Sequence, residues 1–394
     1  MRVRPHRKRP FRPSLSKSLS KTLSGIGNFS AGFDKAFDKV AKSLSLEEFR
    51  HDVVDGLSRP AKSIPCKYLY DEAGARLFDA ICDLEEYYPT RTETAILRRN
   101  IREIAALLGP RCTLVEPGSG AGSKTRLLLD HLDSPEAYVP IDVADRQLLE
   151  CSARLAADYP LLKVSPVCAD YTHDFELPPL SFGSQRTIAV FLGSTIGNFE
   201  PHEAGEFLQR LARLCGNEGG LLIGVDLKKD PPILHRAYND AQGVTAAFNL
   251  NLLGRINRDL AGRLEGSLFR HEAFYNERAG RIEMHLVSRL AQGIRIGSDE
   301  FLLAEGESIR TEHSYKYTRG EFLQLAADAG LEVKRCWTDQ REWFSVHYLA
   351  PFQRDLPAQQ GWKKSCVRPV PKESFLWGAR FHRPTKSEVT KENL

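Results

Sequence analysis

Residues 112–132, CTLVEPGSGAGSKTRLLLDHL, carry the clearest indication of fold in this chain. Their apolar run, their glycine-rich turn and their amphipathic end predict a β-strand, a tight turn and a helix. A helix that begins after such a turn is suited to hold a polar or anionic ligand at its N-terminus. The stretch therefore predicts a binding site, and the rest of the sequence decides which ligand it binds.

Further apolar runs follow this stretch in regular alternation with helical segments. Strand-like runs lie at 137–143, 162–171, 186–194 and 219–227, and helix-like runs lie at 145–159 and 202–216. This alternation is typical of βαβ units and predicts a parallel, doubly wound α/β sheet. Residues 319–331 would add one more helix. Residues 332–340 and 343–350 would complete the sheet as an antiparallel pair.

The alternation breaks between Lys228 and Tyr317, where a smaller α+β unit is inserted. A helical segment at 237–260 precedes strand candidates within 269–296. Right-handed crossovers place the carboxyl ends of all parallel strands at one edge of the sheet, where ligands bind in such folds. We therefore expect the inserted unit to complete a site at that edge.

Composition limits the classes of function. The 394 residues are 42% hydrophobic and 27% charged, and no apolar run approaches the roughly 20 residues of a membrane helix. The formal charge of +4 is too small to indicate nucleic-acid binding by the whole chain. The eight cysteines form no CxxC pair and the histidines form no HExxH pair. We expect buried, reduced thiols, no protein-bound metal, no membrane span, a cytoplasmic location and a monomer.

The two ends of the chain differ from its centre. Residues 1–42 are rich in Arg, Lys and Ser, with no acidic residue before Asp34, and residues 352–394 are rich in proline and basic side chains. A segment of the first kind buries too little apolar surface to order itself. We expect a disordered extension at the N-terminus; a targeting peptide or an electrostatic tether would share its composition.

The glycine-rich turn can be compared with known phosphate-binding motifs. GSGAGSKT comes close to a Walker A loop through Lys124 and Thr125, but Ser123 stands where the second glycine is required. The dinucleotide fingerprint G-x-G-x-x-G fails at the same residue. The pattern that fits is E-x-G-x-G-x-G from Glu116 to Gly122, which resembles motif I of class I S-adenosylmethionine-dependent methyltransferases. A tight strand-to-helix turn without a ligand would need similar glycines.

Acidic and aromatic residues at the next strand ends favour an adenosine ligand. Asp142 follows Gly118 by 24 residues, where a carboxylate accepts hydrogen bonds from both ribose hydroxyls. Asp170 and Tyr171 end the third predicted strand, where they would suit the amine and the face of adenine. Each acid could instead cap a helix. Together, the three positions indicate a nucleoside site.

Five segments carry a more specific resemblance. They are YLYDEAGARLFDAICDLEEYYPTRTE, VEPGSGAGSKT, VFLGSTIGNFEP, HRAYNDAQGVTAAFNLNLLGRINRDL and RIEMHL. In order and spacing they resemble the histidine Nα-methyltransferases of ergothioneine biosynthesis, over roughly Leu46 to Ala350. The resemblance implies a Rossmann-like class I methyltransferase domain, 92–227 plus 318–351, and a discontinuous substrate-binding domain, 46–91 plus 228–317. The extensions 1–42 and 352–394 lie outside it.

The resemblance also implies which residues bind each ligand. The residues expected at S-adenosylmethionine are Tyr70, Gly118, Lys124, Asp142, Asp170 and Tyr171. For L-histidine, it implies Tyr87 near the amino group, Gly193 and Asn198 beside the backbone and Tyr238 at the carboxylate. Glu312 and Ser314, within TEHSYKY, would meet the imidazole, and Met284 would add a pocket contact.

The chemistry of these residue types agrees with that assignment. Glu312 and Ser314 are two residues apart, so on a strand they share a face and could meet both imidazole nitrogens. An exposed, charged edge strand would show the same pattern. Tyr87 is expected to orient the amine rather than to act as a base, because an unperturbed phenol stays protonated at neutral pH.

The sequence thus predicts an S-adenosylmethionine-dependent enzyme that, as the resemblance implies, methylates histidine three times to give hercynine. Three alternatives remain. One is a methyltransferase of another amino acid or amine. Another is a kinase or nucleoside triphosphatase that uses Lys124 and Thr125. The third is a noncatalytic adenosine-binding regulator.

Overall fold

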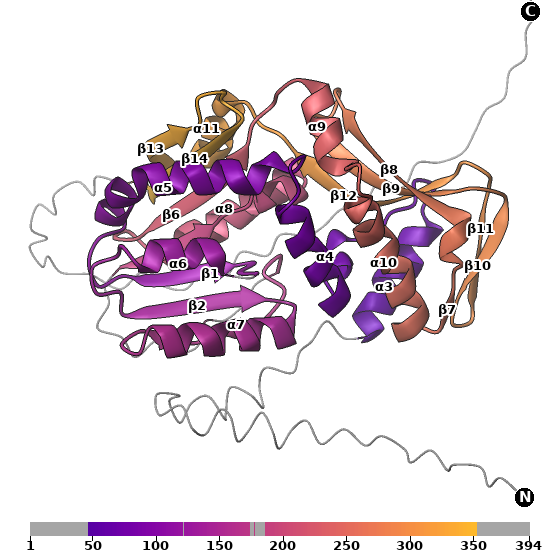
Figure 1. Ribbon diagram of the computed structural model, residues 1–394, viewed down its shortest axis with the longest axis horizontal. Helices are drawn as coiled ribbons and strands as arrows, with labels where there is room; N and C mark the ends of the chain where they lie inside the picture. Colours follow the sequence, from indigo (N-terminus) through magenta and orange to yellow (C-terminus); the bar gives the residue numbers. More distant parts are fainter. Residues whose placement is uncertain (1–45, 121, 174–176, 178–185, 353–394) are drawn as a thin grey trace, which may run out of the picture. The chain divides into compact units, whose positions relative to one another are not determined.

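The computed structural model describes residues 46–120, 122–173, 177 and 186–352, so both predicted extensions lie outside the described residues, except for Phe352. One large sheet organises most of this part (Figure 1). Its strands are β1 Thr113–Pro117, β2 Ala137–Asp142, β3 Lys163–Val164, β4 Val167–Cys168, β5 Thr187–Phe191, β6 Gly220–Asp226, β13 Leu331–Thr338 and β14 Phe344–Pro351.

The strand order is β13-β14-β6-β5-β1-β2-β3, and β4 also pairs with β2. The pairs from β3 and β4 through β6 are parallel, whereas β14 runs antiparallel to β6 and to β13. This arrangement confirms the predicted doubly wound α/β sheet and its antiparallel final pair. The third predicted strand, 162–171, is instead divided into the two short strands β3 and β4.

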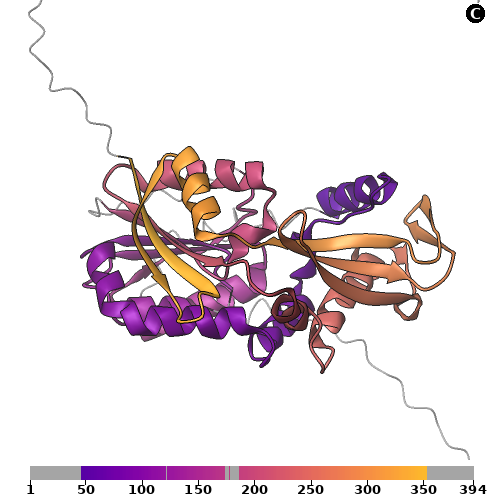
Figure 2. The same cartoon turned by 90° about the horizontal axis from the view of Figure 1, so that it is seen from above.

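Helices cover both faces of this sheet. On one face, α5 Tyr88–Leu108, α6 Ser123–Leu129 and α7 Asp145–Asp158 contribute to one hydrophobic cluster; on the other, α8 Pro201–Cys215 and α11 Arg319–Asp328 contribute to a second. Figure 2 shows the sheet between the purple α5 and the gold α11. Successive residues of β5 alternate between the two clusters, because neighbouring side chains of a strand point to opposite faces. Both faces of this central strand are therefore covered, and its residues after Thr187 are apolar and buried.

The inserted region and the segment before α5 share a core of their own. It is built on two three-stranded sheets, ordered β12-β9-β8 and β11-β10-β7. Their strands are β7 Gly262–Arg263, β8 Phe269–Asn276, β9 Arg281–Ser288, β10 Gln292–Ile296, β11 Asp299–Leu303 and β12 Ser308–Tyr315. The helices are α3 Leu46–Ser58, η1 Cys66–Leu69, α4 Glu72–Cys82, α9 Pro231–Tyr238, α10 Val244–Asp259 and η3 Gly266–Leu268.

The insert leaves the large sheet and returns to it at one point. Leu227, directly after β6, forms a parallel bridge with Tyr317, and the Lys228 amide donates to the Tyr317 carbonyl at 2.9 Å. This closure brings the end of β12 back to the carboxyl edge of the large sheet. The predicted assignment of substrate binding to this region stays a prediction.

The cysteines are less uniformly buried than expected. Seven cysteines in the described ranges are free, but only Cys112 and Cys215 are fully buried, and the other five are partly exposed. The prediction rested on apolar sequence neighbours, which do not indicate that Cys66 and Cys151 each line a cavity. Among the described helices, none is long and apolar enough to cross a membrane.

Candidate functional site

A cavity of about 750 Å³ lies at the carboxyl edge of the large sheet and extends to β12 of the inserted region. Eleven predicted site residues line it: Tyr70, Tyr87, Gly118, Asp142, Asp170, Tyr171, Gly193, Asn198, Tyr238, Glu312 and Ser314. Its volume falls within the range of typical small-molecule sites. Residues separated by almost 250 positions in sequence therefore meet in one cavity.

The glycine-rich turn forms one wall of this cavity. Gly118, Gly120 and Gly122 all have positive φ, at 70°, 49° and 71°, a region that L-residues with side chains rarely adopt. The Gly118 amide donates to the Ile141 carbonyl at 2.7 Å, which fixes the turn against β2. A Cβ atom at Gly118 would lie 3.4 Å from the Tyr171 hydroxyl. Since that distance is an ordinary van der Waals contact, it is the positive φ that requires glycine at this position.

Asp142 ends β2 at this wall, as predicted. Its carboxylate accepts hydrogen bonds from the amides of Gly120 at 3.2 Å and Ala144 at 3.1 Å. Burial raises the pKa of the Asp142 carboxyl, although these amides oppose the shift. Two amides do not use all the lone pairs of a carboxylate, so Asp142 can accept further bonds from hydroxyl groups in the cavity.

Tyr171 lines the same side of the cavity. Its ring packs against Phe191 and Phe207, with centroids 5.9 and 6.0 Å away. These contacts fix the ring plane beside the turn. An aromatic surface of this kind is suited to a flat heterocycle such as adenine.

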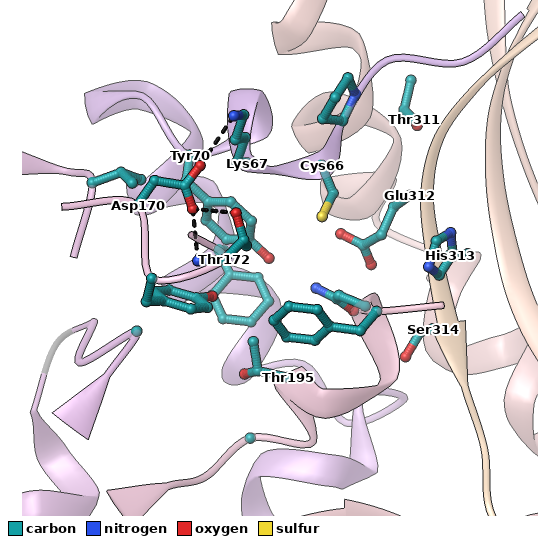
Figure 3. Close-up of a pocket in the computed structure, with 18 of the residues that line it drawn as sticks. Cys66, Lys67, Tyr70, Asp170, Thr172, Thr195, Thr311, Glu312, His313 and Ser314 are labelled. Carbon is teal, nitrogen blue, oxygen red and sulfur yellow. Dashed lines mark hydrogen bonds and ion pairs between the residues drawn. The ribbon is translucent and has the colours of Figure 1, made fainter. Parts of the chain in front are cut away.

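Asp170 is held by a lysine that the sequence analysis did not identify. The Lys67 ammonium lies 3.0 Å from its carboxylate, which also accepts from the amide and hydroxyl of Thr172, as Figure 3 shows. Burial alone would raise the pKa of Asp170, but the Thr172 hydrogen bonds and the Lys67 charge hold it below its usual range. Asp170 is therefore an ionised acceptor at neutral pH.

Lys124, predicted at the methyl donor, is not among the residues that line the cavity. Its ammonium pairs instead with Glu93, a fully buried residue of α5. Glu93 also accepts the Gly193 amide at 2.9 Å. A Cβ atom at Gly224 would lie 1.8 Å from the Glu93 carboxylate, so the glycine in β6 makes room for this acid. Glu93 thus links the glycine-turn helix to the loop after β5.

The opposite wall is formed where β12 packs against η2 Thr195–Asn198. A Cβ atom at Gly197 would lie 2.6 Å from the Tyr315 carbonyl oxygen and 3.2 Å from the Ser314 hydroxyl. Only glycine permits this approach. It places Asn198, which follows β5 in the large sheet, beside Ser314 of the inserted region.

Glu312 and Ser314 both lie in β12, as the sequence predicted, and both line the cavity. A register shift between Arg310 and Glu312 interrupts the pairing of β12 with β9. Figure 3 shows the Glu312 carboxylate pointing into the cavity toward the Cys66 thiol. Burial raises the pKa of Glu312 to about 7, against the opposing charge of Lys316. The carboxyl therefore changes protonation near neutral pH.

Lys316 and Asp226 form a buried ion pair beneath this wall. The ammonium lies 2.9 Å from the Asp226 carboxylate and donates to the hydroxyls of Tyr238 at 3.1 Å and Ser314 at 2.8 Å. Asp226 also accepts from Lys229 at 2.6 Å and from the Tyr88 hydroxyl at 2.8 Å. Burial opposes ionisation of Asp226, but the two ammonium groups hold its pKa below the usual range.

Aromatic rings surround the space between the two walls. Tyr87 and Tyr238 meet edge to face with centroids 6.1 Å apart, and Tyr70 meets Phe78 and Phe248 in the same way at 5.4 Å. Burial raises the pKa of Tyr87 well above its ordinary value, so its phenol is neutral. Such rings tolerate a cation bound between them.

Met284 does not lie where the sequence analysis expected it. It is the cross-strand neighbour of Glu312, but its side chain is 1% exposed within the hydrophobic core and is not part of the cavity lining. A methionine on an inward-facing strand position packs in the core as readily as it contacts a ligand.

Several residues of the site were not predicted from the sequence. Those that line the cavity are Cys66, Lys67, Thr195, Asp226, His313 and Lys316. The sequence positions of two of them could have indicated a place in the site. Lys316 continues the two-residue alternation of Glu312 and Ser314, and Asp226 ends β6 as Asp142 ends β2. Within the described residues, no group of three or more His, Cys, Asp or Glu side chains could hold a metal ion.

Comparison with known proteins identifies relatives over this whole region. Residues 49–351 match the family described as histidine-specific methyltransferase, SAM-dependent. The histidine N-alpha-methyltransferases of Mycolicibacterium smegmatis and Mycobacterium tuberculosis are 42% and 40% identical, and each alignment covers 76% of this chain and 94% of the relative. Ergothioneine biosynthesis protein 1 of Neurospora crassa is 32% identical over 73% of this chain and 33% of its own length.

Proposed function

Because this chain belongs to the SAM-dependent, histidine-specific methyltransferase family, we propose that it transfers methyl groups from S-adenosylmethionine to the α-nitrogen of L-histidine. Three successive transfers give hercynine, the trimethylated betaine, as a step of ergothioneine biosynthesis. The observation that carries the proposal is the single cavity that joins the glycine-rich turn to Glu312 and Ser314. The doubly wound sheet of the chain has the class I methyltransferase fold.

The donor-side wall fits S-adenosylmethionine. Asp142 keeps acceptor capacity for two ribose hydroxyls, Asp170 is ionised, and Tyr171 offers a ring face. Gly118 supplies the positive φ of the turn, and Tyr70 closes the aromatic side. Carboxylates outnumber basic side chains in the lining, which favours a ligand with a positive sulfonium. When bound, this ligand supplies an electrophilic methyl group.

Lys124 does not line the donor-side wall itself. It holds Glu93, whose carboxylate fixes the Gly193 amide. We propose that Lys124 contributes to donor binding through this contact with Glu93 and not by lining the cavity.

The opposite wall suits histidine. We assign Tyr238 to the α-carboxylate, Gly193 and Asn198 to the amino acid backbone, and Glu312 and Ser314 to the imidazole ring. The discontinuous region 46–91 plus 228–317 supplies Tyr87, Tyr238 and the β12 residues, which supports its assignment as the substrate-binding domain. Met284 would act on the ring only through its cross-strand neighbour Glu312.

Methyl transfer requires a neutral amine held in line with the methyl group, about 3 Å from it. A free α-amino group is mostly protonated at pH 7, so its proton must pass to water or to a nearby polar group before transfer. The Tyr87 phenol is neutral and cannot take that proton at pH 7. Tyr87 therefore orients the amine lone pair through its hydroxyl. The surrounding rings of Tyr70 and Tyr238 accommodate the methylated, cationic products.

The test is to incubate the purified chain with S-adenosylmethionine and each of the twenty amino acids and to follow product masses. The expected result is stepwise gain of one, two and three methyl groups on histidine alone, with loss of turnover in Glu312→Ala. Transfer to another amino acid would change the substrate assignment. Donor binding without any transfer would refute the catalytic proposal and favour a noncatalytic adenosine-binding role.

A further inference from the structure

Lys316 donates all of its available hydrogen bonds to three partners. An ammonium has three N–H groups and no acceptor, and here they meet the Asp226 carboxylate, the Tyr238 hydroxyl and the Ser314 hydroxyl at 2.8–3.1 Å. The side chain is 1% exposed, so water does not replace any of these partners. The geometry of the ammonium is therefore saturated by protein groups.

The hydrogen bonds from Lys316 determine whether the hydroxyls of Tyr238 and Ser314 act as donors or acceptors toward other groups. Tyr238 and Ser314 each accept a hydrogen bond from Lys316, so the proton of each hydroxyl must be donated elsewhere. Both residues line the cavity. A hydroxyl whose oxygen already accepts from an ammonium can donate its own proton to an acceptor atom of a ligand in the cavity.

We propose that Lys316 is a positioning residue that fixes Tyr238 and Ser314 as hydrogen-bond donors, so that the substrate ring binds as a neutral imidazole with its bare nitrogen at Ser314. The inference rests on the proposed function. The ring N–H then meets the Glu312 carboxylate, and the Tyr238 hydroxyl meets the α-carboxylate. Lys316 thus acts on specificity without touching the substrate.

The charges around Ser314 agree with a neutral ring. Lys316 and Lys229 both pair with the one carboxylate of Asp226, so two ammonium groups face a single buried anion. An imidazolium placed at Ser314 would add a third cation near Lys316. It would also offer the Ser314 hydroxyl no acceptor nitrogen, because both of its ring nitrogens carry protons. A neutral ring avoids both costs.

An opposite polarity is the competing arrangement. Ser314 also lies near enough to Tyr238 to donate to its oxygen. In that case Ser314 would accept the ring N–H, and Glu312 in its protonated form would donate to the bare nitrogen. The two arrangements make opposite demands on the substrate ring.

Ring analogues of histidine separate the two arrangements. Pyrrolylalanines keep an N–H and lack the acceptor nitrogen, whereas thiazolylalanines keep the acceptor nitrogen and lack the N–H. For each, the better positional isomer is compared with histidine by kcat/KM. We expect the wild-type enzyme to discriminate against pyrrolylalanine by about 10- to 100-fold, because the Ser314 proton loses its acceptor.

Lys316→Met and Ser314→Ala test the origin of that discrimination. Each should reduce the pyrrolylalanine penalty about tenfold and leave the thiazolylalanine penalty, which arises at Glu312, unchanged. Lys229→Met is the matched control, because Lys229 pairs with the same Asp226 but contacts neither hydroxyl. It should keep the wild-type ratio. Binding of S-adenosylmethionine by calorimetry shows that each variant is folded.

Two results would overturn the inference. One is a pyrrolylalanine penalty that survives in both Lys316→Met and Ser314→Ala. The other is relief of the thiazolylalanine penalty by Ser314→Ala, which would establish the opposite polarity. If Lys316→Met does not fold, Ser314→Ala alone still decides. Failure of the proposed function looks different: the wild-type enzyme would bind S-adenosylmethionine without methylating histidine, and the inference would fall with it.

Discussion

The Lys67 ammonium lies 3.0 Å from the Asp170 carboxylate and 2.7 Å from that of Glu48, and so joins the end of β4 to helix α3. Lys67 belongs to η1, in the segment assigned to substrate binding, whereas Asp170 belongs to the donor-side wall. This ion pair therefore ties the donor-side wall to the segment that precedes α5. Its side chains are only 15% and 13% exposed, so salt screens it less than a surface pair.

Replacing Lys67 should weaken binding of the methyl donor. In Lys67→Met, Asp170 loses the ammonium that helps the Thr172 hydrogen bonds to keep it ionised and in place, and we expect the Kd for S-adenosylmethionine to rise about tenfold. Isothermal titration calorimetry measures this directly. Lys62→Met is the control, since Lys62 pairs with Glu307 at 2.7 Å and does not line the cavity. Equal losses in the two variants would contradict a specific role for Lys67.

The pH dependence of histidine use should follow Glu312. Its pKa is raised to about 7 by burial, so the carboxylate that accepts the ring N–H prevails only above that pH. We expect kcat/KM for histidine to fall as pH drops through about 7. In Glu312→Gln this inflection should disappear, leaving only the ionisations of free histidine. An unchanged profile in the variant would assign the inflection to another group.

Glu312 should also make the ligand-free protein less stable above about pH 7 than at pH 4.5. Between pH 4.5 and about 7 the folded protein keeps a proton on Glu312 that the unfolded chain has released, so stability falls as pH rises through this window. The stability of Glu312→Gln relative to wild type should therefore be higher at pH 8 than at pH 4.5, by roughly 3 kcal/mol at most. Urea denaturation at the two pH values measures the difference. A gain independent of pH would contradict this assignment.

Loss of the Tyr87 hydroxyl should slow transfer without changing its pH profile. Tyr87 is a neutral phenol that orients the amine, so Tyr87→Phe should lower kcat about 10- to 100-fold and leave the ionisation of the amine as it was. Rapid-quench measurements at several pH values test this. A shifted basic limb in the variant would show that Tyr87 carries a proton during the reaction.

Much of the large sheet was predictable from the sequence because its signals are local. Apolar runs of strand length alternate with amphipathic helices. The glycines at 118, 120 and 122 mark a turn with positive φ, a backbone conformation that residues with side chains rarely adopt. The division of the third strand into β3 and β4 was not predictable, because it depends on pairing with β2 at two separate places.

The candidate site was predictable where residue type and position at a strand end coincide. Asp142 is an acid at the end of β2, and Glu312 and Ser314 share one face of a strand. Their spacing alone did not exclude a helix cap or a charged edge strand. The resemblance to a family, carried by five segments, made the choice among these alternatives.

The strand, turn and helix pattern and the family could be inferred from the sequence alone, because both depend on the spacing of residues close together in the chain. The pairing of the charged residues became known only from the three-dimensional structure. This structure sets Lys316 on Asp226 across 90 positions, joins Lys67 to Asp170, and turns Lys124 toward Glu93. Such partners depend on close approaches like that of Gly197 to β12, and no local pattern specifies which distant backbone will fill that space.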